Sequence, residues 1–120
     1  MPSAPSFSAE QAAAAKAEVC AAYEKIHRAS VANSGRSGGD DPTAQLAVAI
    51  NERQIYVAGN ARLLGALADE PATPPDLAAA TRKLAKLFQN LTLDNLASDP
   101  AVPEQNEANH TALTIQNLCK

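Results

Sequence analysis

The sequence predicts an all-α domain, an antiparallel four-helix bundle closed by one disulfide between its first and last helices. Alanine supplies 27 of the 120 residues, while there are two Phe, two Tyr and no Trp, and this composition favours helices over strands. Four segments with helical periodicity are separated by short connections rich in Pro or Gly. Cys20 and Cys119 fall in the first and the last of these segments.

The first helix is expected at about 8–33, after a flexible linker at 1–7. Ser8 and Gln11 have the spacing of a capping box, in which each side chain satisfies a free backbone donor of the other residue. The connection at 34–40 is rich in glycine, but it lacks the Lys-Ser/Thr ending of a phosphate-binding loop. The apolar stripe of this helix recurs at steps of three and four: Ala12, Ala15, Val19, Ala22, Tyr23, Ile26 and Ala29.

The second helix is expected at 42–69, because Asp41 is a good N-cap and Pro42 suits the first helical position. The same inward stripe passes through Arg53 and Asn60, two polar residues that need partners if they are buried. We therefore expect Arg53 to reach a carboxylate such as Asp94 or to extend to water. The apolar members of the stripe are Leu46, Ile50, Val57, Leu64 and Leu67. Two glycines of this helix, Gly59 and Gly65, would allow another backbone to come close.

The third helix is expected at 74–98, with Thr73 as its cap and Asp76 in its first turn. It has the richest aliphatic stripe and should supply most of the hydrophobic stabilisation: Leu77, Ala80, Leu84, Leu87, Phe88 and Leu91. The fourth helix is expected at about 104–119, after a break at 99–103. Its apolar side comprises Ala108, Thr111, Ala112, Ile115, Leu118 and Cys119. Residues 8–120 would then form a single domain.

The two cysteines are expected to form a disulfide. Short links favour antiparallel neighbours, which places the end of the fourth helix beside the N-terminal half of the first. A crosslink that closes a loop of about 100 residues stabilises by up to about 4.7 kcal/mol in the chain-entropy model. Such a bond implies an oxidising, extracytoplasmic compartment. The alternative is two unrelated reduced thiols in the cytosol, and the separation of Cys20 from Cys119 does not fit a zinc site.

Several functional classes are not favoured. Ten Lys and Arg against thirteen Asp and Glu, with no basic cluster, exclude an electrostatic footprint for nucleic acid. No apolar run is long enough for a transmembrane helix, and no signal-peptide pattern is present. The two histidines, His27 and His110, begin no metal-ligand motif, so no metal or other cofactor is expected. No nucleophile motif is present, and a non-catalytic role is favoured; a secreted enzyme would require ionisable groups that converge in a cleft.

Residues 17–23, the Ala-Val-Ala at 47–49, the link at 71–77 and the closing residues 118–120 resemble a known family. Over about residues 9–120, the chain is similar to the extracytoplasmic domains of alanine- and proline-rich membrane proteins from mycobacteria and other actinobacteria. In that group a proline-rich cytoplasmic stretch and one transmembrane helix precede an alanine-rich helical domain with one cysteine near each end. The resemblance implies an extracytoplasmic location in the cell envelope. The protein is expected to be anchored to the membrane only through a segment absent from this chain, or to be secreted. The resemblance implies no activity.

Two functional hypotheses follow. The first is a non-catalytic interaction or scaffold module of the cell envelope that binds a protein partner. The second is a small-ligand or lipid-binding bundle with an aliphatic cavity between the second and third helices, where Arg53, Tyr56 and Asn60 are the candidate ligand-binding residues. A solvent-open cavity that reaches Arg53 would favour the second hypothesis. A filled core with an exposed apolar patch would favour the first.

Overall fold

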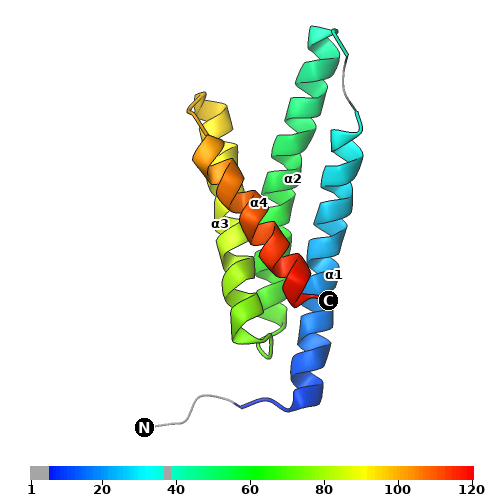
Figure 1. Ribbon diagram of the computed structural model, residues 1–120, viewed down its shortest axis with the longest axis vertical. Coiled ribbons are helices and arrows are strands. Elements are labelled where there is room, and N and C mark those ends of the chain that lie inside the picture. The colour runs from blue at the N-terminus through cyan, green and yellow to red at the C-terminus, as the bar shows by residue number, and fades with distance from the viewer. Residues whose placement is uncertain (1–5, 37–38) are drawn as a thin grey trace.

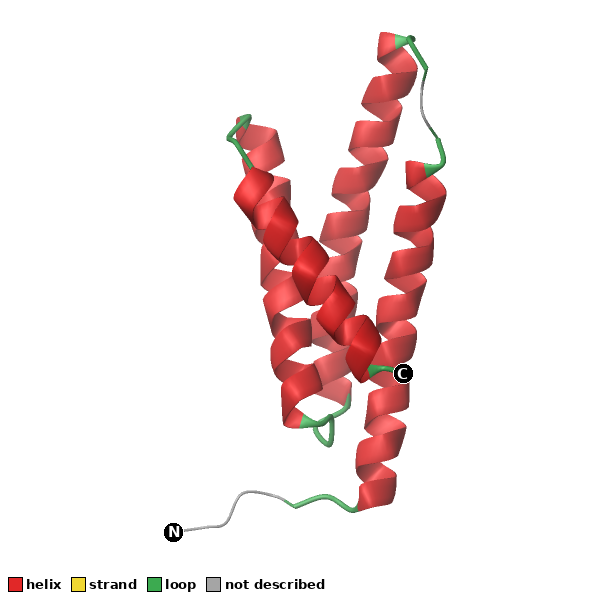
Figure 2. Cartoon of the chain, in the orientation of Figure 1, coloured by secondary structure: helices red, strands yellow, loops and turns green. Residues whose placement is uncertain are grey.

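A computed structural model describes residues 6–36 and 39–120, and the regular secondary structure within them is entirely α-helical (Figures 1 and 2). Four helices follow one another: α1 (Ala9–Ser34), α2 (Pro42–Asp69), α3 (Pro75–Ala97) and α4 (Val102–Leu118). The all-α prediction is confirmed. Most of the linker expected at 1–7 lies outside the described residues, and Ser6 and Phe7 precede α1 without regular structure.

Helices that follow one another in the chain pack on each other: α1 on α2, α2 on α3, and α3 on α4. This arrangement is consistent with the expected antiparallel bundle. α4 departs from a regular bundle because it crosses obliquely from the end of α3 toward the middle of α1 (Figure 1). The radius of gyration is 16.2 Å, against about 13.6 Å for a compact domain of this length. The elongated shape leaves long stretches of helix surface without a neighbouring helix.

The starts of α1 and α2 follow from local sequence chemistry. Ser8 Oγ accepts a hydrogen bond from the backbone N–H of Gln11 at 3.0 Å, and Ser8 N–H donates to Gln11 Oε1 at 2.8 Å, as a capping box requires. Asp41 Oδ1 accepts from the N–H of Thr43 at 3.0 Å, and Pro42 is the first helical residue. Both caps are those that the sequence predicts.

The starts of α3 and α4 differ from the expectation. Thr73 does not cap α3, because its hydroxyl donates backwards to the carbonyl of Glu70 at 2.7 Å. Pro74 occupies the cap position instead, and two successive prolines leave fewer free N–H groups for a side chain to satisfy. α4 begins at Val102, before the expected residue 104, since Pro103 fits within a first helical turn and does not have to precede it.

The core lies along one face of each of the four helices, and the expected stripes of α1, α3 and α4 are largely buried. α3 contributes three of the largest fully buried side chains, Leu77, Leu84 and Leu91. The other main contributors to this cluster are Val19, Tyr23 and Ile26 of α1, Tyr56 and Leu63 of α2, Phe88 of α3, and Ala108 and Ile115 of α4. The aliphatic side of α3 is therefore the centre of the hydrophobic core, as its sequence predicts.

The predicted inward face of α2 is wrong for four of its five apolar residues; the fifth, Leu67, is half-buried and packs against the core. Leu46, Ile50, Val57 and Leu64 are 55%, 41%, 56% and 45% exposed, whereas Tyr56, Gly59 and Leu63 are buried. α2 carries apolar residues around most of its circumference, so periodicity alone does not select the buried side. Consecutive residues are about 100° apart on a helix, and α1 and α3 cover the side that carries Leu63, which turns Leu64 outward.

Gly59 is needed for contact with a side chain, not for the close backbone approach that we expected. A Cβ at Gly59 would lie 2.9 Å from Phe88 Cε2 and 3.3 Å from Ile26 Cγ2. The absent side chain therefore makes room for the Phe88 ring between helices. Gly65 has nothing within 4 Å of the equivalent position, so no close approach explains it.

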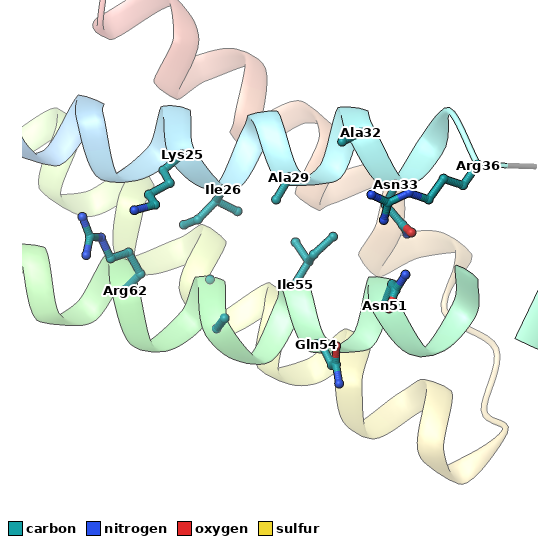
Figure 3. A pocket seen from close by; sticks show the side chains of 12 residues that line it. Lys25, Ile26, Ala29, Ala32, Asn33, Arg36, Asn51, Gln54, Ile55 and Arg62 are labelled. Carbon is teal, nitrogen blue, oxygen red and sulfur yellow. The ribbon is translucent and has the colours of Figure 1, made fainter. Parts of the chain in front are cut away.

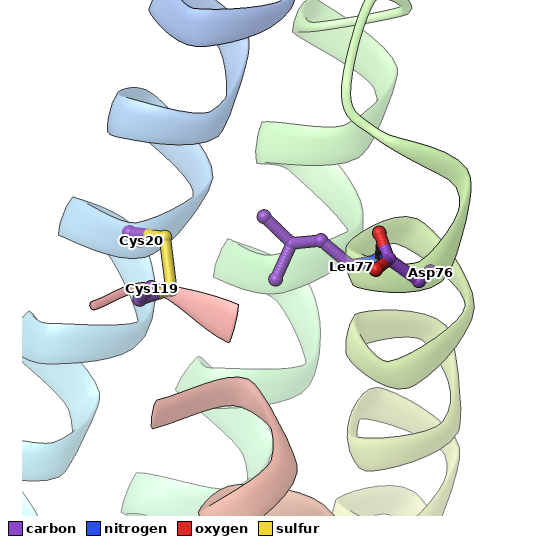
Figure 4. Close-up of a disulfide and its surroundings, with 4 residues drawn as sticks. All are labelled: Cys20, Asp76, Leu77 and Cys119. Atoms are coloured by element: carbon purple, nitrogen blue, oxygen red, sulfur yellow. Dashed lines mark hydrogen bonds between the residues drawn. A yellow bond between two sulfur atoms is a disulfide. The ribbon is translucent and has the colours of Figure 1, made fainter. Parts of the chain in front are cut away.

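The disulfide is confirmed. Cys20 and Cys119, 99 positions apart in the chain, are bonded with a Cα–Cα distance of 5.8 Å. Leu77 of α3 points toward the bond (Figure 4), and both cysteines pack against the core cluster. About one helical turn away, Gln116 Nε2 donates to the Tyr23 hydroxyl at 2.7 Å. The bond and this hydrogen bond together attach α4 to α1.

Candidate functional site

The three residues predicted as a ligand site do not share one lining: Tyr56 lines a groove beneath α4, and Arg53 and Asn60 do not. Tyr56 donates from its hydroxyl to Gln105 Oε1 at 3.0 Å, and Asn60 Nδ2 donates to the Ala85 carbonyl at 2.6 Å. Tyr56 and Asn60 therefore fasten α2 to α4 and α3. Arg53 is partly exposed. Among the described residues the ion pair present is Lys83–Glu107 at 3.0 Å, so the expected pairing of Arg53 with Asp94 is not formed.

The two tyrosines of the core are held in the protonated form. Burial raises the pKa of Tyr56 well above its ordinary value of 10.0, and the nearby Glu52 carboxylate raises it further, while the hydrogen bond with Gln105 opposes part of the shift. Burial also raises the pKa of Tyr23, again against the effect of its bond with Gln116. Both hydroxyl groups therefore act as neutral hydrogen-bonding groups well into the alkaline range.

An exposed apolar stripe runs along α2, and we call Leu46, Ile50, Val57 and Leu64 the α2 stripe. Three of them recur every seven residues, the repeat of a coiled-coil seam. The stripe covers 18 residue steps, or about 27 Å of helix. Arg53 lies at an intervening position of the same seam. An exposed row of apolar residues with this spacing is typical of a surface that receives another helix.

A groove of about 590 Å³ lies between α1 and α2, and we call it the α1–α2 groove (Figure 3). Its floor is apolar, with Ile26, Ala29, Ile55 and Ala58 among its lining residues, and its volume is that of an ordinary small-molecule site. The cationic side chains Lys25, Arg36 and Arg62 also line it. The described residues that line the groove include no aspartate or glutamate.

A second groove of about 480 Å³ lies beneath α4, between it and the α1–α2 pair. Its lining includes Tyr23, Tyr56, Gln105 and Gln116, the four side chains whose hydrogen bonds hold α4 in place. This groove is therefore part of the α4 attachment. Tyr56 of α2 and Phe88 of α3 also line it, and their rings stack with centroids 5.4 Å apart.

Asn33 closes one end of the α1–α2 groove. Only 2% of its surface is exposed, and its Nδ2 donates to the Val48 carbonyl at 3.1 Å and to Glu52 Oε2 at 3.0 Å. Its Oδ1 is buried without a hydrogen-bond partner. The sequence offered one signal for this residue, because Asn33 lies seven residues after Ile26 and so continues the inward stripe of α1.

The cations of the groove were not predicted as a site. Lys25 reads in the sequence as part of a solvated face, and no motif marks Arg36 or Arg62. A partial signal exists, since Lys25 and Arg36 are 11 residues apart and so share one side of α1. Arg62 comes to line the same groove because of the way α1 and α2 pack, and no local sequence pattern predicts that packing.

Residues 6–36 and 39–120 contain no group of three or more His, Cys, Asp or Glu side chains placed to hold a metal ion. His27 stacks on Tyr23 with ring centroids 5.8 Å apart, and His110 is exposed on α4. Within the same residues, no helix combines the length and apolar character that a bilayer crossing requires.

The fold and its surfaces thus define a disulfide-linked helical domain with an exposed apolar stripe and a cationic, apolar-floored groove. Comparisons of the chain with protein-family models, with curated proteins and with solved structures find no match.

Proposed function

We propose that the chain is the extracytoplasmic domain of a membrane-anchored cell-envelope protein, an antiparallel four-helix bundle that serves as a non-catalytic interaction or scaffold module. The disulfide supports an oxidising compartment. The likeness to mycobacterial alanine- and proline-rich membrane proteins supports the actinobacterial envelope and an anchor supplied by a segment absent from this chain.

The observation that carries an interaction role is the α2 stripe. A single-chain domain has a free-energy reason to bury Ile50, Val57 and Leu64, yet each is at least 41% exposed. Their seven-residue repeat matches the seam that one helix offers to another. We propose that the partner is an amphipathic helix of a second envelope protein, with Arg53 available to a carboxylate at its edge.

Site-specific photo-crosslinking tests this proposal in cells that make the protein. A photoreactive residue at Val57 should give a discrete adduct with one other protein, and the same residue at Gln89, exposed on α3, should not. Ile50→Asp/Leu64→Asp should abolish the adduct. Ile50 and Leu64 are 41% and 45% exposed, and circular dichroism should show that the double variant stays folded. No adduct, or equal adducts at Val57 and Gln89, would contradict the proposal, and an adduct of twice the mass would reassign the stripe to self-association.

A second function, the binding of a small ligand or lipid, is favoured by the α1–α2 groove. The groove lies between α1 and α2, not between α2 and α3, and neither Arg53 nor Asn60 lines it. The residues that would bind a ligand are therefore different from those expected from the sequence.

A further inference from the structure

We infer that the α1–α2 groove binds a single-chain anionic amphiphile, a long-chain carboxylate, with its headgroup between Lys25 and Arg62 and its alkyl chain along the apolar floor toward Asn33. This inference deepens the second of the two proposed functions. It does not depend on the α2 stripe.

The headgroup position follows from charge. Lys25 extends from α1 and Arg62 from α2, and they point toward one another across the groove (Figure 3). Neither forms an ion pair with a described residue. Two cations that face each other repel, and an anion between them removes the repulsion and accepts hydrogen bonds from both. The whole chain has a net charge of −3, whereas the described residues that line the groove are cationic or uncharged.

Nearby acidic residues limit where the anion can lie. Arg62 also borders a smaller hollow of about 200 Å³ whose lining includes Glu18, Asp69 and Glu70. Because Arg62 is not ion-paired with any of them, its donors remain available. Repulsion from these carboxylates disfavours an anion in that hollow and favours one on the Lys25 side of Arg62.

The floor accommodates an alkyl chain. Between the cations at the two ends of Figure 3 lie Ile26, Ala29 and Ile55, with Ala58 and Gly59 also in the lining. The small side chains leave the space, and the two isoleucines supply the apolar contact. Lys25 and Arg36 are 11 residues apart, so the groove follows about 16 Å of helix. A straight apolar groove of this length between two helices suits a linear chain.

The polarity of the far end fixes the orientation of the chain. Both Nδ2 donors of Asn33 are used by Val48 and Glu52, and its remaining polar atom, Oδ1, is an acceptor without a partner. Asn33 therefore has no free donor to offer a carboxylate there. The headgroup therefore belongs at the Lys25–Arg62 end, although Arg36 is also near Asn33 (Figure 3).

Calorimetric titration of the full oxidised chain with laurate, below its micellar concentration, tests the inference. Lys25→Glu/Arg62→Glu should weaken laurate binding at least tenfold, about 1.4 kcal/mol. The matched control Arg82→Glu/Lys86→Glu makes the same change in net charge at exposed α3 positions outside the groove and should bind as the wild type does. Arg36→Glu should have a smaller effect than the double reversal. Equal binding by both double variants, or a larger effect of Arg36→Glu, would overturn the assignment.

Two further probes separate headgroup from chain. Dodecyl maltoside below its micellar concentration carries a neutral headgroup, acetate carries the headgroup without the chain, and each should bind at least tenfold more weakly than laurate. Ala29→Phe/Ala58→Phe, at two exposed positions, should block laurate while leaving the melting temperature close to that of the wild type. Equal affinity for the neutral detergent would show that the headgroup charge is not recognised, and unchanged binding by the filled variant would show adsorption outside the groove. Either result would overturn the inference.

The failure of this inference can be told apart from failure of the interaction role. Ile50→Asp/Leu64→Asp, which removes the α2 stripe, should leave laurate affinity unchanged. If it abolishes laurate binding, the fatty acid occupies the stripe and the groove assignment is wrong. Photo-crosslinking from Val57 reports on the protein partner whichever way the laurate titration ends.

Discussion

Loss of the Cys20–Cys119 bond should lower the melting temperature by about 19 °C. The two cysteines are 99 positions apart, and a loop of about 100 residues corresponds to about 4.7 kcal/mol of chain entropy in the unfolded state. For 120 residues, the entropy of unfolding near 60 °C is about 0.25 kcal/mol per kelvin, and dividing the first quantity by the second gives the shift.

The folded structure indicates why little else would compensate. α4 packs mainly on α3, and its attachment to α1 rests on the disulfide and on the hydrogen bond from Gln116 to Tyr23. A hydrogen bond of this kind contributes about 1 kcal/mol. Without the crosslink, the C-terminal end of α4 should separate from α1 before the remaining helices unfold.

Thermal unfolding followed by circular dichroism measures the shift in oxidised protein, reduced protein and the variant Cys20→Ser/Cys119→Ser. The reduced protein and the variant should agree with each other. In urea, their m-values should exceed that of the oxidised protein, because the uncrosslinked unfolded chain exposes more surface. A decrease of less than about 5 °C in both forms, with unchanged m-values, would refute the assignment of this stabilisation to the unfolded chain.

Three further predictions concern the interior of the bundle. Gly59→Ala should destabilise by about 1–3 kcal/mol, because its Cβ would lie 2.9 Å from the Phe88 ring, whereas the control Gly65→Ala, with open space around it, should stabilise by about 1 kcal/mol through helix propensity; urea unfolding measures both, and equal effects would show that the contact is not tight. Burial raises the pKa of Tyr56 in the folded state, so its contribution to stability is complete below pH 10 and declines by about 1.36 kcal/mol per pH unit above it; Tyr56→Phe should reduce this alkaline dependence in denaturation experiments from pH 8 to 12, and an identical pH profile would contradict the shift. Asn60→Ala should lower the free energy of unfolding by about 1 kcal/mol, because the hydrogen bond to the Ala85 carbonyl is lost. Thermal unfolding measures this change, and an unchanged melting temperature would show that the bond makes no net contribution to stability.

Local chemistry explains why much of the fold could be predicted. The Ser8 and Asp41 caps depend on residues within three positions of each other, so they are visible in a short window of sequence. The α3 stripe was also visible, because its aliphatic residues are separated from Arg82, Lys83 and Lys86 on the helix surface. Where the pattern has one apolar face, the buried side follows from it.

α2 and the groove depend on packing between helices, which no short window contains. Leu63 and Leu64 are adjacent and chemically identical, yet one is fully buried and the other is 45% exposed. The choice between them follows from the position of Gly59, which admits Phe88 from another helix. In the same way, Lys25 and Arg62 become a pair only once α1 and α2 are aligned, whereas the candidates that the sequence suggested, Arg53, Tyr56 and Asn60, all lie on α2.

The sulfur–sulfur bond also determines how this chain would respond to mechanical tension. A pull applied between its two ends would pass directly from residue 20 to residue 119 and bypass the intervening polypeptide. In the oxidised protein, the polypeptide between the two cysteines could not extend under this load. Reduction would release 99 further residue steps, about 330 Å of extended chain. Because the disulfide bears the tension, the helices between the two cysteines would stay folded while the chain is pulled.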